Sequence, residues 1–139
     1  RVAPRLSSAK LSRTRFRGGS KRTALSASAR SGTTLSVKVS EAAQLTVTVD
    51  RERPGRRSTA KGHRCIRVSH KPDKHACIAY MHDATLRRTV KRAGTTRVAI
   101  TGRLGHTRLA VGRHRLTLQA RDAAGNRSRT VTLRVEVVR

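Results

Sequence analysis

Cysteines and histidines gather in one segment of the chain, and this is the only cluster whose residue types suggest chemistry. Cys65 and Cys77 are separated by eleven residues, and His63 and His75 each precede a cysteine by two positions. Thiolate and imidazole groups are ligands that Zn²⁺ takes in structural sites, whereas two cysteines in an oxidising compartment form a disulfide. The histidines of this segment are His63, His70, His75 and His82.

The residues around the cysteines favour the disulfide over zinc. The spacing does not follow the usual ligand pairs of zinc fingers, and Arg64, Lys71 and Lys74 would crowd further positive charge around a dication. A disulfide between Cys65 and Cys77 would close a loop and stabilise the fold by about 3 kcal/mol in the chain-entropy model. We therefore predict a disulfide and neither a bound metal nor another cofactor, with structural zinc and free thiols as the alternatives.

Asp122 stands between two runs of alternating polar and apolar residues, in a chain with only seven Asp and Glu residues. It could be a catalytic acid, a Ca²⁺ ligand or a turn residue. A short acidic side chain at the start of a turn accepts hydrogen bonds from the backbone N–H groups that follow it. Gly125 can take a positive φ angle freely and Asn126 tolerates one. These three residues predict a hairpin turn, and the scattered positions of the other acids argue against Ca²⁺, which needs several convergent oxygens.

Motifs of enzymatic chemistry are missing from the sequence. There is no G-x-S-x-G elbow, no Walker-type glycine loop and no H-E-x-x-H zinc motif. A catalytic carboxylate pair would need two of the seven acids to converge. We therefore expect no enzymatic activity and assign no catalytic residue.

The formal charge of +26, from 33 Lys and Arg against seven Asp and Glu, suggests an anionic partner. Nucleic acid, anionic polysaccharide, a cell-wall polymer and lipid headgroups all qualify, and a coding bias towards Arg is the alternative explanation. Phe16 and Tyr80 are the only aromatic residues, and no recognition helix is evident, so nucleic acid is expected to bind only non-specifically. The candidate polyanion contacts are Arg51, Arg53, Arg56, Arg57, Lys61, Arg64, Arg67, Lys71 and Lys74.

Apolar residues alternate with polar ones along most of the chain, which predicts half-buried antiparallel strands. Turn signals such as Pro54-Gly55, Ala93-Gly94 and Val111-Gly112 separate these runs. About seven strands result, without a strong amphipathic helix, and the fold class is therefore all-β, an antiparallel β-sandwich. The alternating runs are residues 34–40, 44–52, 95–102, 114–121 and 130–138, with 84–90 as a weaker candidate.

Two segments depart from this regular pattern. Residues 1–16 carry Leu6, Leu11 and Phe16 with the spacing of a first strand that bends or switches sheets. Residues 51–82 form a long polar insertion that contains both cysteines, and such a long loop in a compact domain is usually functional or tied down. The expected organisation is thus an N-terminal segment, 1–16, followed by one domain, 17–139.

The stretches GTTLSVKVSEAAQLTVTVDRERPGRR and GRLGHTRLAVGRHRLTLQARDAAGNRS resemble bacterial Ig-like or fibronectin-III-like modules. The run of strand and turn that ends in A-x-D-A-A-G-N carries this resemblance, which covers the chain from about Pro4 onward. Relatives usually have Tyr at the position of His114, where the ring closes a corner before the penultimate strand. An imidazole can donate the same hydrogen bond but fills less volume.

The resemblance implies a secreted or cell-surface module that acts as a spacer, an adhesion domain or an assembly unit. Its expected partners are an anionic envelope polymer or polysaccharide, neighbouring domains, or copies of itself. No stretch approaches the ~18 apolar residues of a transmembrane span. The chain begins at Arg1 and looks like a piece of a longer product. On this interpretation, residues Val2 to Phe16 are expected to add a strand to the sheet of a neighbour.

Overall fold

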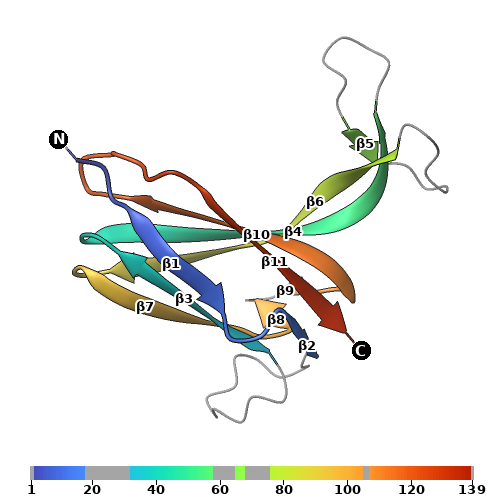
Figure 1. The fold of residues 1–139 in the computed structure, drawn as a ribbon, viewed down its shortest axis with the longest axis horizontal. Coiled ribbons are helices and arrows are strands. Elements are labelled where there is room, and N and C mark those ends of the chain that lie inside the picture. The colour runs from blue at the N-terminus through green and yellow to red at the C-terminus, as the bar shows by residue number, and fades with distance from the viewer. Residues whose placement is uncertain (1, 18–31, 58–64, 68–75, 105–106, 139) are drawn as a thin grey trace.

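A computed structural model describes residues 2–17, 32–57, 65–67, 76–104 and 107–138 of the chain. The described residues form strands joined by turns, and they contain no helix. The strands are organised in two main sheets and one two-stranded ribbon (Figure 1). The prediction of an all-β protein is therefore confirmed.

The smaller main sheet has the strand order β1-β3-β7 and is antiparallel. The larger has the order β2-β11-β10-β4-β5, and β6 also pairs with β4. Strands β8 and β9 form the separate ribbon. The bounds are β1 Leu6–Leu11, β2 Arg15–Arg17, β3 Thr33–Val39, β4 Ala43–Arg57, β5 Cys65–Arg67, β6 Ala76–Val90, β7 Gly94–Ile100, β8 Arg103–Leu104, β9 Thr107–Arg108, β10 Gly112–Arg121 and β11 Val131–Val138.

The core lies between the two main sheets because alternate residues of their strands face one another. In β3, every second residue from Thr33 to Val39 is buried, and the same alternation runs through β10 from His114 to Ala120. Aliphatic and mostly β-branched side chains suit such a surface, and each fully buried one contributes about 1.5–3 kcal/mol. The buried apolar residues shared by the two sheets include Leu35, Val37, Val39, Leu45, Val47, Val49, Val98, Ile100, Leu116, Leu118, Ala120, Val135 and Val137.

The N-terminal segment contributes one strand to each main sheet. Strand β1 pairs antiparallel with β3, and β2 pairs parallel with β11 through Arg15–Arg17. Phe16 in β2 is buried in the shared core. This segment is therefore already paired within its own chain, and it is not a free strand that could add to the sheet of a neighbour.

Strands β4 and β6 are much longer than the others, and their far halves leave the two-sheet body as an arm (Figure 1). Strand β10 pairs with β4 only as far as Arg51, whereas β6 continues alongside β4 to Arg56. We use "arm" for residues 51–57 of β4, 65–67 of β5 and 76–82 of β6. The described part of the predicted polar insertion is therefore strand rather than loop.

The turn expected at Pro54-Gly55 is wrong, because both residues lie inside β4. Pro54 stands between Arg51, the last β4 residue paired with β10, and Gly55, the first paired with β5. Among the described residues, no strand pairs with this edge of β4 at Pro54. Open strand edges tolerate proline, which has no backbone N–H to donate. The expected count of about seven strands also missed β5, β8 and β9, which are only two or three residues long, and it counted β2 as part of the first strand.

Candidate functional site: the arm and its base

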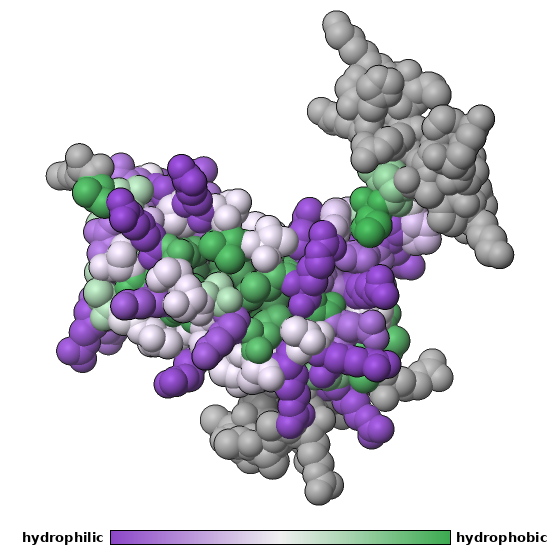
Figure 2. Space-filling model, viewed as in Figure 1, coloured by the Kyte–Doolittle hydropathy of each residue, from purple (hydrophilic) through white to green (hydrophobic). Residues whose placement is uncertain are grey.

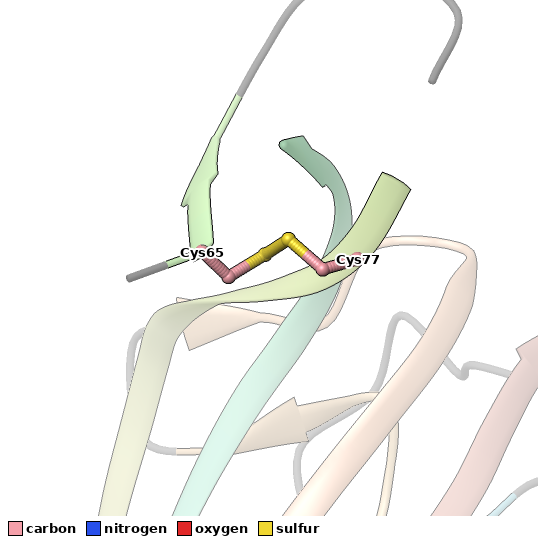
Figure 3. The surroundings of a disulfide bond; sticks show 2 residues. All are labelled: Cys65 and Cys77. Atoms are coloured by element: carbon pink, nitrogen blue, oxygen red, sulfur yellow. A yellow bond between two sulfur atoms is a disulfide. The ribbon is translucent and has the colours of Figure 1, made fainter. Parts of the chain in front are cut away.

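A disulfide between Cys65 on β5 and Cys77 on β6 braces the arm (Figure 3). The Cα atoms of the two cysteines are 6.0 Å apart. Both strands also pair with the same end of β4, with Cys65 opposite Arg57 and Cys77 opposite Gly55. The disulfide therefore ties three strands together at a point far from the core, and neither cysteine remains as a thiolate that could bind zinc.

The residues predicted to contact polyanions fall into four groups. Arg53 is exposed on the arm. Arg51 is half-buried, its Nη2 lies 3.5 Å from Sδ of Met81, and its buried Nε makes no hydrogen bond with a described residue, so Arg51 is a packing residue of the arm. Arg56, Arg57 and Arg67 lie in strands β4 and β5 at the end of the arm that the disulfide braces, where only the backbone is described. Lys61, Arg64, Lys71 and Lys74 lie outside the described residues, as do His63, His70 and His75.

At the base of the arm, Asp50 joins three strands. It is buried, and its Oδ2 accepts a hydrogen bond of 2.9 Å from Nη2 of Arg115 on β10. Its Oδ1 lies 3.4 Å from Nδ1 of His82 on β6, and the other ring nitrogen of His82 is 3.2 Å from Oγ1 of Thr85. A β-bulge next to Asp50 changes the register between β4 and β6 at the same point. The bulge and the carboxylate together mark where the arm leaves the body.

Tyr80 adds a second set of contacts at the base. The guanidinium carbon of Arg115 lies 3.5 Å from the centre of the Tyr80 ring, which is a cation–π contact. Nη1 of Arg134 on β11 donates to the Tyr80 hydroxyl at 3.2 Å and to Oε1 of Glu52 at 2.8 Å. The hydrogen bond to Tyr80 is the main cause that raises the pKa of Arg134, and Glu52 adds a smaller effect in the same direction. We call Asp50, Glu52, Tyr80, His82, Arg115 and Arg134 the arm-base network.

His114 makes a separate contact with the base of β6. Its ring is fully buried, with Nε2 3.2 Å from Oδ2 of Asp83 and Nδ1 3.1 Å from the carbonyl oxygen of Gly112. Asp83 is the residue that the bulge leaves unpaired with β4. At the position where the sequence predicted a corner, the His114 ring thus contacts a backbone carbonyl and, in addition, a carboxylate on β6. The ring is sealed from solvent and has no access to a substrate.

The turn after β10 lies at the opposite end of the body from the arm. Asp122 accepts hydrogen bonds from the backbone N–H of Asn126 at 2.8 Å and from its side-chain amide at 3.0 Å. The backbone N–H of Gly125 donates to the carbonyl oxygen of Asp122, and Gly125 has a φ angle of 89°. The structure therefore places Asp122, Gly125 and Asn126 together in one turn. They are far from the arm and are not part of the site.

The acidic side chains are concentrated where the arm meets the body. Asp50 contacts Arg115 and His82, Glu52 contacts Arg134, and Asp83 contacts His114. Glu136 on β11 pairs with Arg15 at 3.2 Å and with Arg113 at 3.8 Å. Most of the remaining described Lys and Arg side chains are exposed and form no ion pair with another described residue. These include Arg5, Lys38, Arg53, Arg87, Arg88, Lys91, Arg92, Arg97, Arg127 and Arg129. The surface away from the arm base is therefore positive almost everywhere.

The arm-base network was not predicted from the sequence. Its members come from four strands, and the pairs are separated by up to 82 residues, so no local spacing reveals them. The sequence offers only a short apolar run, Ile78 to Met81, directly before the predicted strand 84–90. Such a run is consistent with a strand but does not show alternation.

Comparison of the chain with protein-family models, with curated proteins and with solved structures found no match. Among the described residues, no group of three or more His, Cys, Asp or Glu side chains converges as a metal site would require. The same part of the chain contains no helix with the length and apolar character needed to cross a membrane.

Proposed function

We propose that this chain is an Ig-like or fibronectin-III-like module of a secreted or cell-surface protein, and that it displays the arm rather than catalysing a reaction. The arrangement of the seven longer strands supports this class. In chain order, the first, second and fifth form one sheet, and the seventh, sixth, third and fourth form the other. Ig domains divide their strands in a similar way, with the third, sixth and seventh in one sheet. The fourth strand, β6, pairs with the third here.

The observation that carries the proposal is the braced arm. Two strands leave the body together, and a disulfide holds a third strand to them at the far end. A disulfide suits an exported protein because reducing compartments keep thiols reduced. The arm buries little apolar surface, so its length does not serve the core. It contributes a stiff basic projection, which fits contact with an anionic polymer of the cell envelope.

The arm can be removed without cutting the core, which gives a direct test. Arg51 and Met81 face each other in the register of β4 and β6, so an Asn-Gly turn can replace residues 52–80. We expect the full chain to co-sediment with cell-wall sacculi that carry a polyglycerol-phosphate polymer, and the arm-deleted chain to bind at least tenfold less. Sacculi stripped of the polymer should bind neither protein. Equal binding of the two proteins to the intact sacculi would refute the role of the arm.

The second candidate function is non-specific polyanion binding, which the uneven pairing of charges favours. The described acids are mostly held in ion pairs at the arm base, so exposed Lys and Arg face solvent over the rest of the surface. A bulk polycation binds every polyanion alike and loses affinity steeply with salt, by counterion release. Titration against DNA and against an acidic glycan at low salt and at ~0.15 M salt separates the candidates, since the screening length is then ~8 Å. A preference retained at the higher salt supports the first function, and its loss supports the second.

A further inference from the structure

The side of the body between β1 and β11 leaves two strand edges open. Strand β1 is the last strand of its sheet, and only β3 pairs with it. Strand β11 pairs with β10 along its length, but on its other edge β2 covers only Glu136 to Val138. The edge of β11 from Val131 to Val135 therefore has no hydrogen-bonded strand partner among the described residues. The two open edges run along the same seam, where β1 and β11 touch.

These two edges differ in how they are protected against another strand. The register of β1 shifts between Ser7 and Lys10, Ser8 has a positive φ angle of 51°, and Lys10 is exposed. Bulges and edge lysines are devices that block pairing with a further strand. Strand β11 has none of them, because its register with β10 runs without a break from Val131 to Val137. Of these two edges, only that of β11 is regular enough to pair with a further strand.

A groove of about 550 Å³ lies at the open end of this edge. Residues 2–6 form one wall, and residues 127–131 form the other. Its apolar lining includes Pro4, Leu6 and Val131, and Leu6 and Val131 also pack against the core. Figure 2 shows apolar side chains along this face of the body, surrounded by hydrophilic ones. The volume is within the range of pockets that hold small ligands.

The polar lining of the groove is positive. Arg5, Arg127 and Arg129 line it, all three are exposed, and none forms an ion pair with a described residue. No acidic side chain is among the described residues that line the groove. Guanidinium groups recognise carboxylates through paired, charge-assisted hydrogen bonds. The groove thus joins a regular backbone edge, an apolar floor and three unpaired cations.

We propose that this groove binds an extended segment of a partner protein in which carboxylates alternate with apolar side chains. The segment adds as a strand to the open edge of β11, beginning at Val131. Alternation follows from strand geometry, because successive side chains point to opposite faces. One set then covers the apolar floor, and the other meets the arginines. A second copy of this chain does not fit, since each copy carries a formal charge of +26.

The test uses a fluorescent eight-residue peptide of alternating Glu and Val, titrated by anisotropy at ~0.15 M salt, where long-range charge attraction is screened. We expect the double variant Arg127→Gln, Arg129→Gln to bind this peptide about a hundredfold more weakly than the parent, or about tenfold per lost charge-assisted contact. The matched control is Arg97→Gln, Arg108→Gln, which removes the same charge from exposed sites outside the groove. It should change the affinity less than twofold. Equal losses in the two double variants would overturn the proposal.

Two further peptides separate strand addition from simple charge attraction. Polyglutamate of the same length lacks the apolar set and should bind at least tenfold more weakly than the alternating peptide. In the alternating peptide, N-methylation of every second residue blocks the hydrogen bonds of one strand edge. Methylation in one frame should abolish binding, while methylation in the other frame leaves it nearly unchanged. Equal affinities in the two frames, or a polyglutamate that binds as well as the alternating peptide, would show that no strand is added.

Discussion

At the scale of single residues, His114 shows how a buried polar ring is accommodated in an aliphatic core. Each of its ring nitrogens faces an acceptor, Asp83 on one side and the carbonyl of Gly112 on the other. A buried polar group that loses its partner keeps the full cost of desolvation. The contact also fixes β6 to β10, which are not neighbours in the sheet because β4 lies between them. His114 is therefore a structural link between β10 and the residue of β6 next to the arm, Asp83.

Replacing Asp83 with Ala removes the partner of Nε2 and leaves that nitrogen buried. We expect the free energy of unfolding to fall by about 1–3 kcal/mol, measured by urea denaturation under non-reducing conditions. Glu41→Ala serves as the control, because Glu41 has no described partner, and it should change the value by less than ~0.5 kcal/mol. The double variant Asp83→Ala, His114→Leu should lose less than the sum of the single changes. An effect of Asp83→Ala as small as that of the control would contradict the link.

Gly125 offers a second test at this scale, because its φ angle of 89° is unfavourable for a residue with a Cβ atom. Space is not limiting, since the nearest atom to an added Cβ is the Arg121 side chain at 3.6 Å. Gly125→Ala should therefore cost only backbone strain, about 1–2 kcal/mol, which lowers Tm by several degrees in a scanning calorimeter. Gly125→Asn should lower Tm less, because Asn tolerates this region. Equal Tm values for the two variants would argue against strain.

At the scale of elements, the strands of the body were readable from the sequence and the arm was not. Residues 35–39 or 116–120 alternate apolar with polar because one face of each strand covers a core. Arg51, Glu52 and Arg53 show no such alternation, since neither face of the arm covers a second sheet. The disulfide was predictable because the chain has only two cysteines. The arm-base network was not, because its pairs form only once four strands have assembled.

The disulfide should stabilise the arm rather than the whole fold. Among the side chains that the structure describes in the arm, those of residues 51–55, 65 and 77–82, none belongs to the apolar cluster between the sheets, so the body should not depend on the brace. We expect reduction, or Cys65→Ser with Cys77→Ser, to speed amide hydrogen exchange in β5 and in residues 76–80 by at least tenfold. Local openings of this kind need not involve global unfolding. The exchange rates of β3 and β10 should stay the same, and faster exchange throughout the body would show that the disulfide holds the whole fold.

At the scale of the whole molecule, the distribution of charge and the direction of the arm have a common origin. The few acids are placed largely at the junction of arm and body, where Asp50 and Glu52 on β4 bind arginines on β10 and β11. Each pair is partly exposed on the arginine side, so its individual contribution to stability is modest. Acting together across four strands, the pairs and the Tyr80 contact oppose bending at the place where β4 loses its pairing with β10.

This arrangement predicts that arm and body reorient as one unit until the network is broken. Residual dipolar couplings from the amides of both parts should fit a single alignment tensor in the unmodified protein. In the variant Asp50→Ala, Glu52→Ala, the arm should need its own tensor with reduced order. The carboxylates that hold Arg115 and Arg134 are then gone, and only the Tyr80 contacts and the two backbone strands of β4 and β6 join the arm to the body. The control Glu41→Ala, Glu136→Ala removes the same charge without touching the arm-base network, and it should keep the single tensor. If the first variant also fits one tensor, the direction of the arm is set by strand pairing and the bulge alone.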